Sequence, residues 1–382
     1  MRRVYLDHNA TTPVRPEIQA RVAPLIFAGP EDPRFGNASS VHWAGQRARR
    51  ELETARAQLA GHFERRAADV IFTSGGTEAD NLALFGVLRH PGLHPPRLVV
   101  SSVEHPAVRA AAAHLRDAGV SVQTVGVDAQ GQLDLEALKV ALQTPTTLVS
   151  VMAVNNETGI ISPIEPIVDL AHAAGALVHV DAVQAVGRIE LPLQADLISI
   201  SGHKLGGLKG VGALISREGI SLAPQSVGGP QERGHRAGTE PVALAVSLSE
   251  AVQLAERERP EQTARLGALR DQIDTAIADL PGLRVLSGQR VTNTTCAVLS
   301  GVDGEVVLQG LDLDGVAASS GSACSSGSLE PSHVLCAMGT PEDEALSALR
   351  FSLGWSSTEA DVHRLLEVLP EVIARARHAQ TV

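Results

Sequence analysis

The segment SGHKLGG places three reactive side chains within four positions. Ser201, His203 and Lys204 follow the apolar run DLISI directly. A lysine on a short, glycine-flanked loop beside an apolar sheet can have its pKa lowered by burial, which suits Schiff-base chemistry. Taken alone, an exposed loop lysine is the more common explanation, so Lys204 needs support from other residues.

That support comes from the ends of two other apolar runs. Asp181 and Gln184 follow ALVHV, and an aspartate there costs free energy unless it meets a cation or hydrogen-bond donors. Gly76 and Thr77 follow DVIFT, where N–H groups at a helix N-terminus form a phosphate cradle, although a tight turn also requires glycines. A phosphate cradle, an aspartate for a pyridinium nitrogen and a lysine for a Schiff base are what a pyridoxal phosphate enzyme requires. Their combination predicts this cofactor. A dinucleotide is excluded because SGGTEADN lacks the G-x-G-x-x-G spacing.

Three further polar residues lie near the ends of apolar runs or within one. His105 follows RLVVSSVE and suits stacking on an aromatic ligand, acid–base chemistry or simple packing. Asn155 follows TLVSVMA, where its amide can bond a ligand or stabilise a turn. Arg350, in ALRFSLG, suits bidentate capture of a substrate carboxylate, with a surface ion pair as the alternative.

The three cysteines differ in their surroundings. Cys324 lies in SSGSACSSGS, whose serines and glycines favour an exposed loop, and exposure is where a reactive thiolate belongs. Cys296 and Cys336 lie in apolar segments and are predicted to be small buried hydrophobes. An odd number of cysteines without Cys-x-x-Cys spacing argues against a disulfide framework and against a structural zinc site, so we expect no metal.

The elements that must position these residues alternate between strand and helix patterns. Seven apolar runs read as strands, at residues 69–73, 97–102, 120–126, 147–153, 176–181, 196–200 and 212–216. Helical stretches between them predict an α/β fold with a mostly parallel sheet. The last two strands are too close in sequence for a parallel crossover, so we expect one antiparallel edge strand.

The pattern changes after about residue 255, where helices frame shorter strands. We expect a large domain over residues 15–255. A smaller α+β domain would comprise residues 1–14 and 256–382 and carry Cys324.

Composition excludes several classes of protein. The 382 residues are 44% hydrophobic and 20% charged, which is typical of a globular chain. A formal charge of −11 and few aromatic residues argue against binding to nucleic acid, which needs basic groups and stacking surfaces. No run of 18 or more apolar residues suggests a membrane span, and Asp7 and His8 interrupt any export signal. We therefore expect a cytoplasmic location.

Motifs along nearly the whole chain resemble one enzyme family. In order and spacing, LDHNATTPV, FGNASSVHWAG, FTSGGTEADN, EHPAV, VNNETG, HVDAVQAVG, SISGHKLGGLKGVGAL, HRAGTE, SSGSACSSGSLEPSHVL and LRFSLG resemble the cysteine desulfurases of iron–sulfur cluster assembly. These are class V, fold-type I pyridoxal phosphate enzymes. The resemblance implies conversion of L-cysteine to L-alanine, with the sulfur transferred to an enzyme cysteine as a persulfide.

The resemblance also implies a role for each candidate around the cofactor ring. Lys204 would carry the cofactor as a Schiff base and remove the substrate Cα proton. Asp181 would pair with the ring nitrogen, and Gln184 would bond the phenolic oxygen. His105 would stack on the ring and shuttle the proton of the substrate thiol.

The remaining implied roles concern the phosphate, the substrate and the partners. The residues that would hold the phosphate are Gly76, Thr77, Ser201, His203 and, from the second subunit of a homodimer, Thr239. Asn155 and Arg350 would hold the substrate carboxylate, and Cys324 would be the nucleophile. A sulfur-acceptor or iron–sulfur scaffold protein would receive the sulfur, for iron–sulfur clusters or for tRNA thiolation.

Three positions depart from the family pattern, and three rival functions stay open. Ala38 and Leu208 stand where the family usually has proline, and Trp355 stands where arginine is common. The rivals are a selenocysteine lyase or cysteine sulfinate desulfinase of the same family, an aminotransferase of the same fold, and a non-catalytic scaffold.

Overall fold

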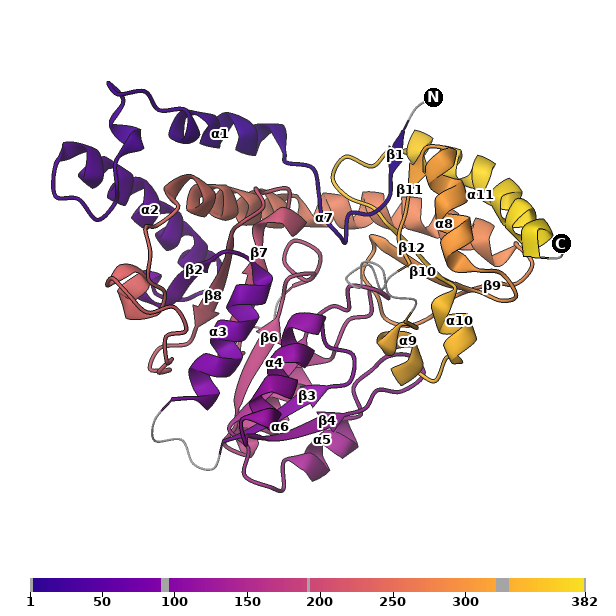
Figure 1. Ribbon diagram of the computed structural model, residues 1–382, viewed down its shortest axis with the longest axis horizontal. Helices are drawn as coiled ribbons and strands as arrows, with labels where there is room; N and C mark the ends of the chain where they lie inside the picture. The colour runs from indigo at the N-terminus through magenta and orange to yellow at the C-terminus, as the bar shows by residue number, and fades with distance from the viewer. Residues whose placement is uncertain (1–2, 91–95, 191–192, 321–329, 381–382) are drawn as a thin grey trace.

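The protein is described by a computed structural model covering residues 3–90, 96–190, 193–320 and 330–380 (Figure 1). Its main feature is a seven-stranded sheet built from the predicted apolar runs. In spatial order the strands are β2 (Val70–Thr73), β8 (Gly212–Ser216), β7 (Leu197–Ser201), β6 (Leu177–Asp181), β5 (Leu148–Met152), β3 (Arg97–Ser101) and β4 (Ser121–Val125). The predicted α/β class and mostly parallel sheet are confirmed.

The antiparallel strand is not at the edge, which corrects one expectation. β8 runs antiparallel to β7, as the short link between them requires, but β2 pairs antiparallel with its other side. The edge strands are therefore β2 and β4. Pairing of β2 with β8 joins segments about 140 residues apart, from Phe72 to Ala213, and no local pattern indicates it.

Helices cover both faces of the sheet, as parallel strands require. On one face α3 (Gly76–Leu88) and α4 (Pro106–Asp117) enclose an apolar core with β2, β3, β5, β7 and β8. The helices on the opposite face are α1 (Pro16–Ile26), α2 (Trp43–His62), α5 (Leu135–Ala141), α6 (Ile164–Ala173) and the first half of α7 (Val242–Ala278).

The C-terminal part adds a smaller α+β unit beside the sheet (Figure 1). It contains a three-stranded antiparallel sheet ordered β12 (Ala348–Ser352), β10 (Thr294–Leu299) and β9 (Leu283–Val285). A parallel pair joins β1 (Val4–Tyr5) to β11 (Val316–Ala317), which brings the N-terminus into this unit. Its helices are α8 (Gly304–Leu313), α9 (His333–Ala337), α10 (Glu342–Leu346) and α11 (Glu359–Gln380).

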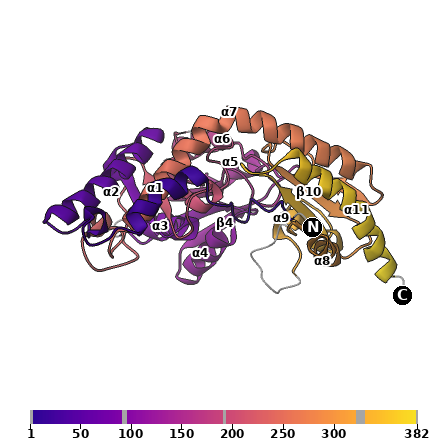
Figure 2. The ribbon, with the colours of Figure 1, turned by 90° about the horizontal axis from the view of Figure 1, so that it is seen from above.

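One long helix connects the two parts of the chain. α7 runs unbroken through the boundary expected after residue 255, and it extends along the molecule in Figure 2. Its first half packs into the core of the large sheet, whereas Leu266 and Ile273 belong to the core of the smaller unit.

Of the two cysteines that the structure describes, one is buried as the sequence predicted and the other is not. Cys296 is buried as predicted, whereas Cys336 is only partly buried, because the short helix α9 lies near the surface. Cys324 lies outside the described residues.

No helix in the described ranges is long and apolar enough to cross a membrane. Within those ranges no group of three His, Cys, Asp or Glu residues could hold a metal.

Candidate active site

A cavity of about 370 Å³ opens at the carboxyl ends of β6 and β7 and at the start of α3. We call it the main cavity. Clefts at this end of a parallel sheet are the usual ligand sites of α/β folds, and the volume suits a small cofactor. The predicted residues that line it are Gly76, Thr77, His105, Asp181, Gln184, Ser201, His203, Lys204 and Arg350. The structure thus brings together nine of the candidates from five separate segments.

Lys204 lies in a 3₁₀ turn over Gly202–Lys204 that follows β7 directly. Its Nζ donates hydrogen bonds to the backbone oxygens of Asn9, at 2.5 Å, and Ala10, at 2.8 Å. The N-terminal segment therefore directs the amine into the main cavity.

Asp181 is the last residue of β6 and is 5% exposed. Its Oδ1 accepts the backbone N–H of Val183 at 2.9 Å. Burial raises the pKa of Asp181, while His105 and Lys204 oppose this rise. Asp181 is therefore suited to face a cation, such as a protonated ring nitrogen.

Two more carboxyl groups lie buried beside this site, and the sequence analysis missed both. Asp80 lines the main cavity one turn into α3, and Glu104 precedes His105. Burial raises the pKa of both groups well above the ordinary range, and the charge of Asp181 raises both further. Among the described residues, Asp80 Oδ1 and Glu104 Oε2 have no hydrogen-bond partner. Asp80 and Glu104 therefore hold protons more readily than free carboxyl groups.

A buried histidine lies beside Asp80. His179 Nδ1 is 2.8 Å from Ser150 Oγ, and Nε2 is 2.9 Å from Ser199 Oγ and 3.5 Å from Asp80 Oδ1. Burial lowers the pKa of His179 to about 3, so the ring is neutral at neutral pH. It therefore brings no charge to the carboxyl cluster.

Other residues of the main cavity, at the start of α3 and after β7, are suited to an anion. α3 begins at Gly76, and its first N–H groups need acceptors from outside the helix. Ser201 Oγ is buried and has no partner within the described ranges. His203 Nδ1 lies 3.1 Å from Thr11 Oγ1, and burial, with smaller effects of Lys204 and Lys209, lowers the pKa of His203 to about 4.

These features test whether pyridoxal phosphate fits. A phosphate requires N–H and hydroxyl donors, which the start of α3 and Ser201 present. A ring nitrogen requires a buried carboxylate, and Asp181 lies in the same cavity. An aldehyde requires an amine, and Lys204 Nζ is directed into that cavity. The residues therefore fit this cofactor.

His105 has one ring nitrogen already engaged, and Gln184 has both its amide nitrogen and its amide oxygen engaged. His105 caps α4, since its Nδ1 accepts the N–H of Ala107 at 3.1 Å, and burial lowers its pKa. Gln184 Nε2 donates to the Asn9 oxygen at 2.9 Å, and its Oε1 accepts from Arg188.

Arg350 lies on β12 as predicted, but its closest partner belongs to the protein. Its guanidinium donates to Asp7 Oδ1 at 2.6 Å and to the Asn156 backbone oxygen at 2.9 Å, and the side chain is buried. The pair is therefore a buried one rather than the surface pair considered as the alternative. A substrate carboxylate would have to share Arg350 with Asp7.

Asn155 and Thr239 do not line the main cavity. Asn155 Oδ1 accepts bonds from Glu157 and Thr158, and its amide donates to the Val103 oxygen and Met152 Sδ. This geometry assigns Asn155 to the turn and does not offer its amide to a ligand. Thr239 is exposed on a loop whose Arg236 pairs with Glu78 at 3.0 Å.

The N-terminal segment contributes more than the sequence analysis assigned to it. Asn9 and Ala10 line the main cavity, and Asp7 pairs with Arg350. The motif LDHNATTPV was part of the family resemblance, so a signal existed. Its distance in sequence from Lys204 and Arg350 concealed the contacts.

One of the three departures from the family pattern, Leu208, has a local explanation, and the other two make local contacts. The N–H of Leu208 donates to the buried Ser247 Oγ at 2.8 Å, a bond that proline could not make. Ala38 is buried and its oxygen accepts from Arg49. Trp355 donates from Nε1 to the Pro13 oxygen at 3.0 Å.

Comparisons with known proteins agree with this geometry. Residues 4–365 match the family Aminotransferase class-V. A cysteine desulfurase of Gluconacetobacter diazotrophicus is 44% identical, covering 99% of this chain and 95% of the relative. The cysteine desulfurase IscS of Dictyoglomus turgidum is 40% identical, covering 98% and 96%. A solved NifS-like protein superposes with a TM-score of 0.91 at 31% identity, covering 98% of this chain and 100% of that one.

Proposed function

We infer that this chain, which belongs to the aminotransferase class-V family, is a pyridoxal 5′-phosphate-dependent cysteine desulfurase. The observation that carries this conclusion is the meeting of Lys204, Asp181 and the start of α3 in one cavity. The relatives named as cysteine desulfurases, aligned over nearly their whole length, support it.

The cofactor and the protein divide the chemistry between them. When bound, pyridoxal phosphate supplies an aldehyde that condenses with amines and a ring that withdraws electrons from the substrate Cα. Lys204 Nζ supplies the amine, and Asp181 supplies the carboxylate for the ring nitrogen. Gly76, Thr77, Ser201 and His203 supply the donors for the phosphate.

The protein's own residues then move protons and receive the sulfur. Lys204 Nζ would take the proton from the substrate Cα, and His105 would take the proton of the substrate thiol. The thiolate of Cys324 attacks the substrate sulfur. The carbon–sulfur bond would break, a sulfur–sulfur bond would form on Cys324, and protons would be added to the substrate Cβ and returned to its Cα. L-Cysteine and a thiol thus become L-alanine and a persulfide, with atoms and electrons balanced.

Simultaneous measurement of both products tests this function. With L-cysteine and a thiol reductant, the purified protein should release alanine and sulfide in equal amounts. Cys324→Ala should lose turnover, whereas the matched control Cys336→Ala, in the partly buried helix α9, should keep it. Normal cysteine turnover by Cys324→Ala would refute the persulfide route and favour the rival selenocysteine lyase or desulfinase.

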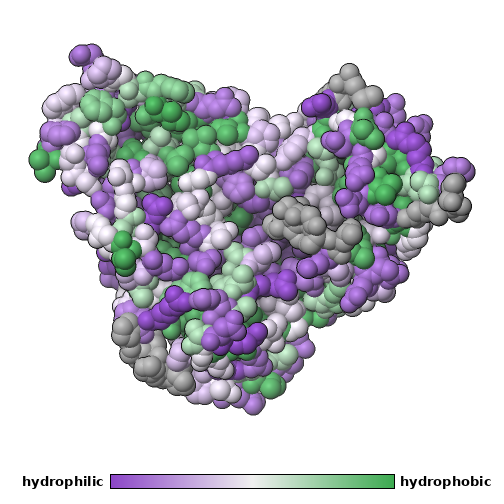
Figure 3. Space-filling view, viewed as in Figure 1, coloured by the Kyte–Doolittle hydropathy of each residue, from purple (hydrophilic) through white to green (hydrophobic). Residues whose placement is uncertain are grey.

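The working form would be a homodimer, and the persulfide sulfur would pass to an acceptor or scaffold protein. Large apolar side chains are exposed around α1 and the start of α2, at Ile26, Phe27, Phe35, Val41 and Trp43. Apolar atoms gather over this end of the molecule in Figure 3. Such a patch favours a protein interface. The exposure of Thr239, outside its own main cavity, also fits a role in a partner subunit.

Subunit mixing tests the dimer and the role of Thr239 together. Lys204→Ala subunits lack the amine, and Thr239→Val subunits lack the hydroxyl. If Thr239 serves the neighbouring subunit, the mixed dimer contains one complete site, and activity should rise above that of either variant alone. Activity equal to the average of the two variants would refute the shared site, and a monomer by light scattering would refute the dimer.

A further inference from the structure

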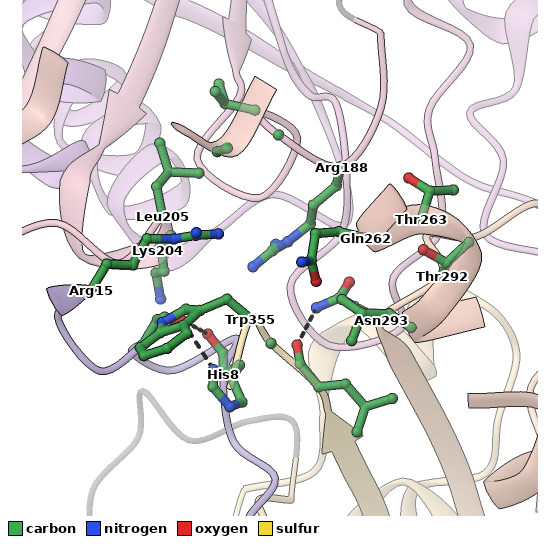
Figure 4. A pocket seen from close by; sticks show the side chains of 17 residues that line it. His8, Arg15, Arg188, Lys204, Leu205, Gln262, Thr263, Thr292, Asn293 and Trp355 are labelled. Atoms are coloured by element: carbon green, nitrogen blue, oxygen red, sulfur yellow. Dashed lines mark hydrogen bonds between the residues drawn. The ribbon is translucent and has the colours of Figure 1, made fainter. Parts of the chain in front are cut away.

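A second cavity lies on the other side of Lys204 (Figure 4). It encloses about 70 Å³, several times the roughly 10–15 Å³ that one water molecule needs. Among the described residues, Lys204 is the one that lines both cavities. The remaining walls come from the N-terminal segment, from Gly187 and Arg188, from α7 and from the turn at Trp355.

Three cationic side chains converge on this space, which we call the cation cavity. Figure 4 shows Arg15 and Arg188 pointing into it from different segments, and Lys204 forms part of its wall. No Asp or Glu is among the described residues that line it. A buried cation that no anion compensates raises the free energy of the folded protein.

Arg188 is the least compensated of these cations. Its guanidinium donates to the backbone oxygen of Gln184 at 2.8 Å and to Gln184 Oε1, which are both neutral acceptors. It forms no ion pair with any residue in the described part of the chain. Burial, with a smaller effect of the charge of Arg350, lowers the pKa of Arg188 to about 10.

Two buried nitrogen atoms around the cavity also lack partners. Arg15 pairs with Glu258 at 2.6 Å through one terminal nitrogen, yet its buried Nε has no partner among the described residues. His8 is 1% exposed, and its Nε2 is likewise without a partner there. Burial, with a smaller effect of Arg188, lowers the pKa of His8 to about 4, so the ring is neutral at neutral pH. A neutral ring can donate one hydrogen bond without adding charge.

We propose that the cation cavity binds a small inorganic oxyanion, held by the guanidinium groups of Arg188 and Arg15. Guanidinium groups match the geometry of oxyanions, which they bind through paired N–H donors. Thr263 and Thr292 offer hydroxyl groups from the same walls. An anion here would lie beside the Lys204 amine, separate from the phosphate donors and from Arg350 in the main cavity.

Selenate, an oxyanion that can be located by its anomalous scattering, tests the position directly. Crystals of the holoenzyme soaked in selenate should show an anomalous peak within hydrogen-bond distance of the Arg188 guanidinium. The peak should be absent from Arg188→Gln crystals soaked in the same way. A cavity without a peak, or a peak unchanged in Arg188→Gln, would overturn the proposal.

Calorimetry with sulfate at constant ionic strength tests the site in solution. The holoenzyme should bind one sulfate per chain with a saturable heat. Arg188→Gln should weaken that affinity by at least about tenfold, since hydrogen bonds to charged groups contribute about 1.5–3 kcal/mol. Arg188→Lys should restore part of the loss by keeping the charge. The matched control Arg116→Gln removes an exposed arginine of α4 and should leave the affinity unchanged.

Other calorimetric results also decide whether the cation cavity binds an oxyanion. Sulfate heats that do not saturate, or that Arg116→Gln reduces as much as Arg188→Gln, would identify non-specific screening and refute the site. If Arg188→Gln does not fold, as judged by circular dichroism and cofactor content, Arg15→Gln takes its place with the same expected loss.

Discussion

The two cavities on either side of Lys204 differ in the buried ionisable groups that surround them. The main cavity lies beside the buried carboxyl groups of Asp181, Asp80 and Glu104, two of which have oxygens without partners among the described residues. The cation cavity is lined by Arg15 and Arg188, with no described acidic residue in its walls. One amine therefore lies between a cavity beside buried carboxyl groups and a cavity lined by two arginines.

The difference between the two cavities shows how a buried charged group without a partner in the chain indicates a bound proton or ligand. A buried charge is costly unless it is paired, so an unmet charge in a stable fold indicates a proton or a partner from outside the chain. In the main cavity the partners are protons on Asp80 and Glu104 and the ring nitrogen of the cofactor facing Asp181. In the cation cavity the partner is the proposed oxyanion. Both assignments can be tested by substitutions that change the residues of one cavity and leave those of the other unchanged.

Replacement of Lys204, which lines both cavities, should have the largest effect on turnover. Lys204→Ala removes the amine that binds the cofactor aldehyde and moves the substrate proton. Turnover of L-cysteine should fall by at least about a thousandfold, within the range expected when a catalytic acid or base is lost. Alanine formation at saturating L-cysteine measures this loss.

Lys209→Ala is the matched control, because Lys209 is exposed five residues away in the same loop. It should keep turnover within about twofold, a change of less than about 0.5 kcal/mol in the barrier. Turnover by Lys204→Ala at the level of Lys209→Ala would contradict the role of the amine in the main cavity.

The next largest effect should separate the carboxyl groups within the main cavity. Asp181→Asn removes the carboxylate that faces the ring nitrogen, and kcat should fall about a hundredfold or more, as for other lost electrostatic contacts. Asp80→Asn should change kcat by less than about threefold, because burial raises the pKa of Asp80 and an amide resembles a protonated carboxyl group.

Steady-state kinetics and the visible absorbance of the cofactor at several pH values measure the two variants side by side. Only Asp181→Asn should shift the pH dependence of the absorbance. Equal losses in both variants would mean that Asp80 also carries a negative charge, and the assignment of protons in the main cavity would be wrong.

The sequence allowed prediction of the residues that define the main cavity, but not of the buried carboxyl groups beside it or of the cation cavity. Lys204, Asp181 and Ser201 were predictable because they end or follow apolar strands, and the ends of parallel strands meet at one edge of a sheet. Asp80 and Glu104 gave no such signal, because their burial depends on how α3 and α4 pack against the sheet.

The cation cavity and parts of the fold depend on contacts between distant segments. Arg15, Arg188 and Trp355 are far apart in the chain and meet only after folding. The inward position of β8 likewise depends on pairing with β2. The continuity of α7 was missed because the change in composition near residue 255 lies inside one helix.

His8 at the cation cavity and Asp80 at the main cavity should contribute to the pH dependence of stability with opposite signs. The pKa of His8 falls from 6.5 to about 4 on folding, so its contribution is full above pH 6.5 and is lost as the pH falls towards 4. The loss amounts to about 3 kcal/mol, at about 1.4 kcal/mol per pKa unit. The pKa of Asp80 rises on folding, so its contribution is full below pH 3.8 and is lost as the pH rises through the raised value.

Urea unfolding at pH values from 4 to 7 measures both contributions. His8→Gln should flatten the loss of stability on acidification, and Asp80→Asn should instead steepen it, because the opposing contribution is gone. A change in the same direction for both variants would contradict the opposite contributions of His8 and Asp80.

The smallest effect should come from the half-buried side chain at the rim of the cation cavity. Trp355 donates a hydrogen bond to the Pro13 oxygen, and its ring lies 5.6 Å from the Arg15 guanidinium carbon. Trp355→Phe keeps an aromatic face but loses the donor, so the free energy of unfolding should fall by about 0.5–1.5 kcal/mol. Sulfate affinity should change less than about threefold, because Trp355 carries no charge and Phe still stacks on the cation. A loss as large as that of Arg188→Gln would mean that the shape of the rim, rather than the converging cations, makes the site.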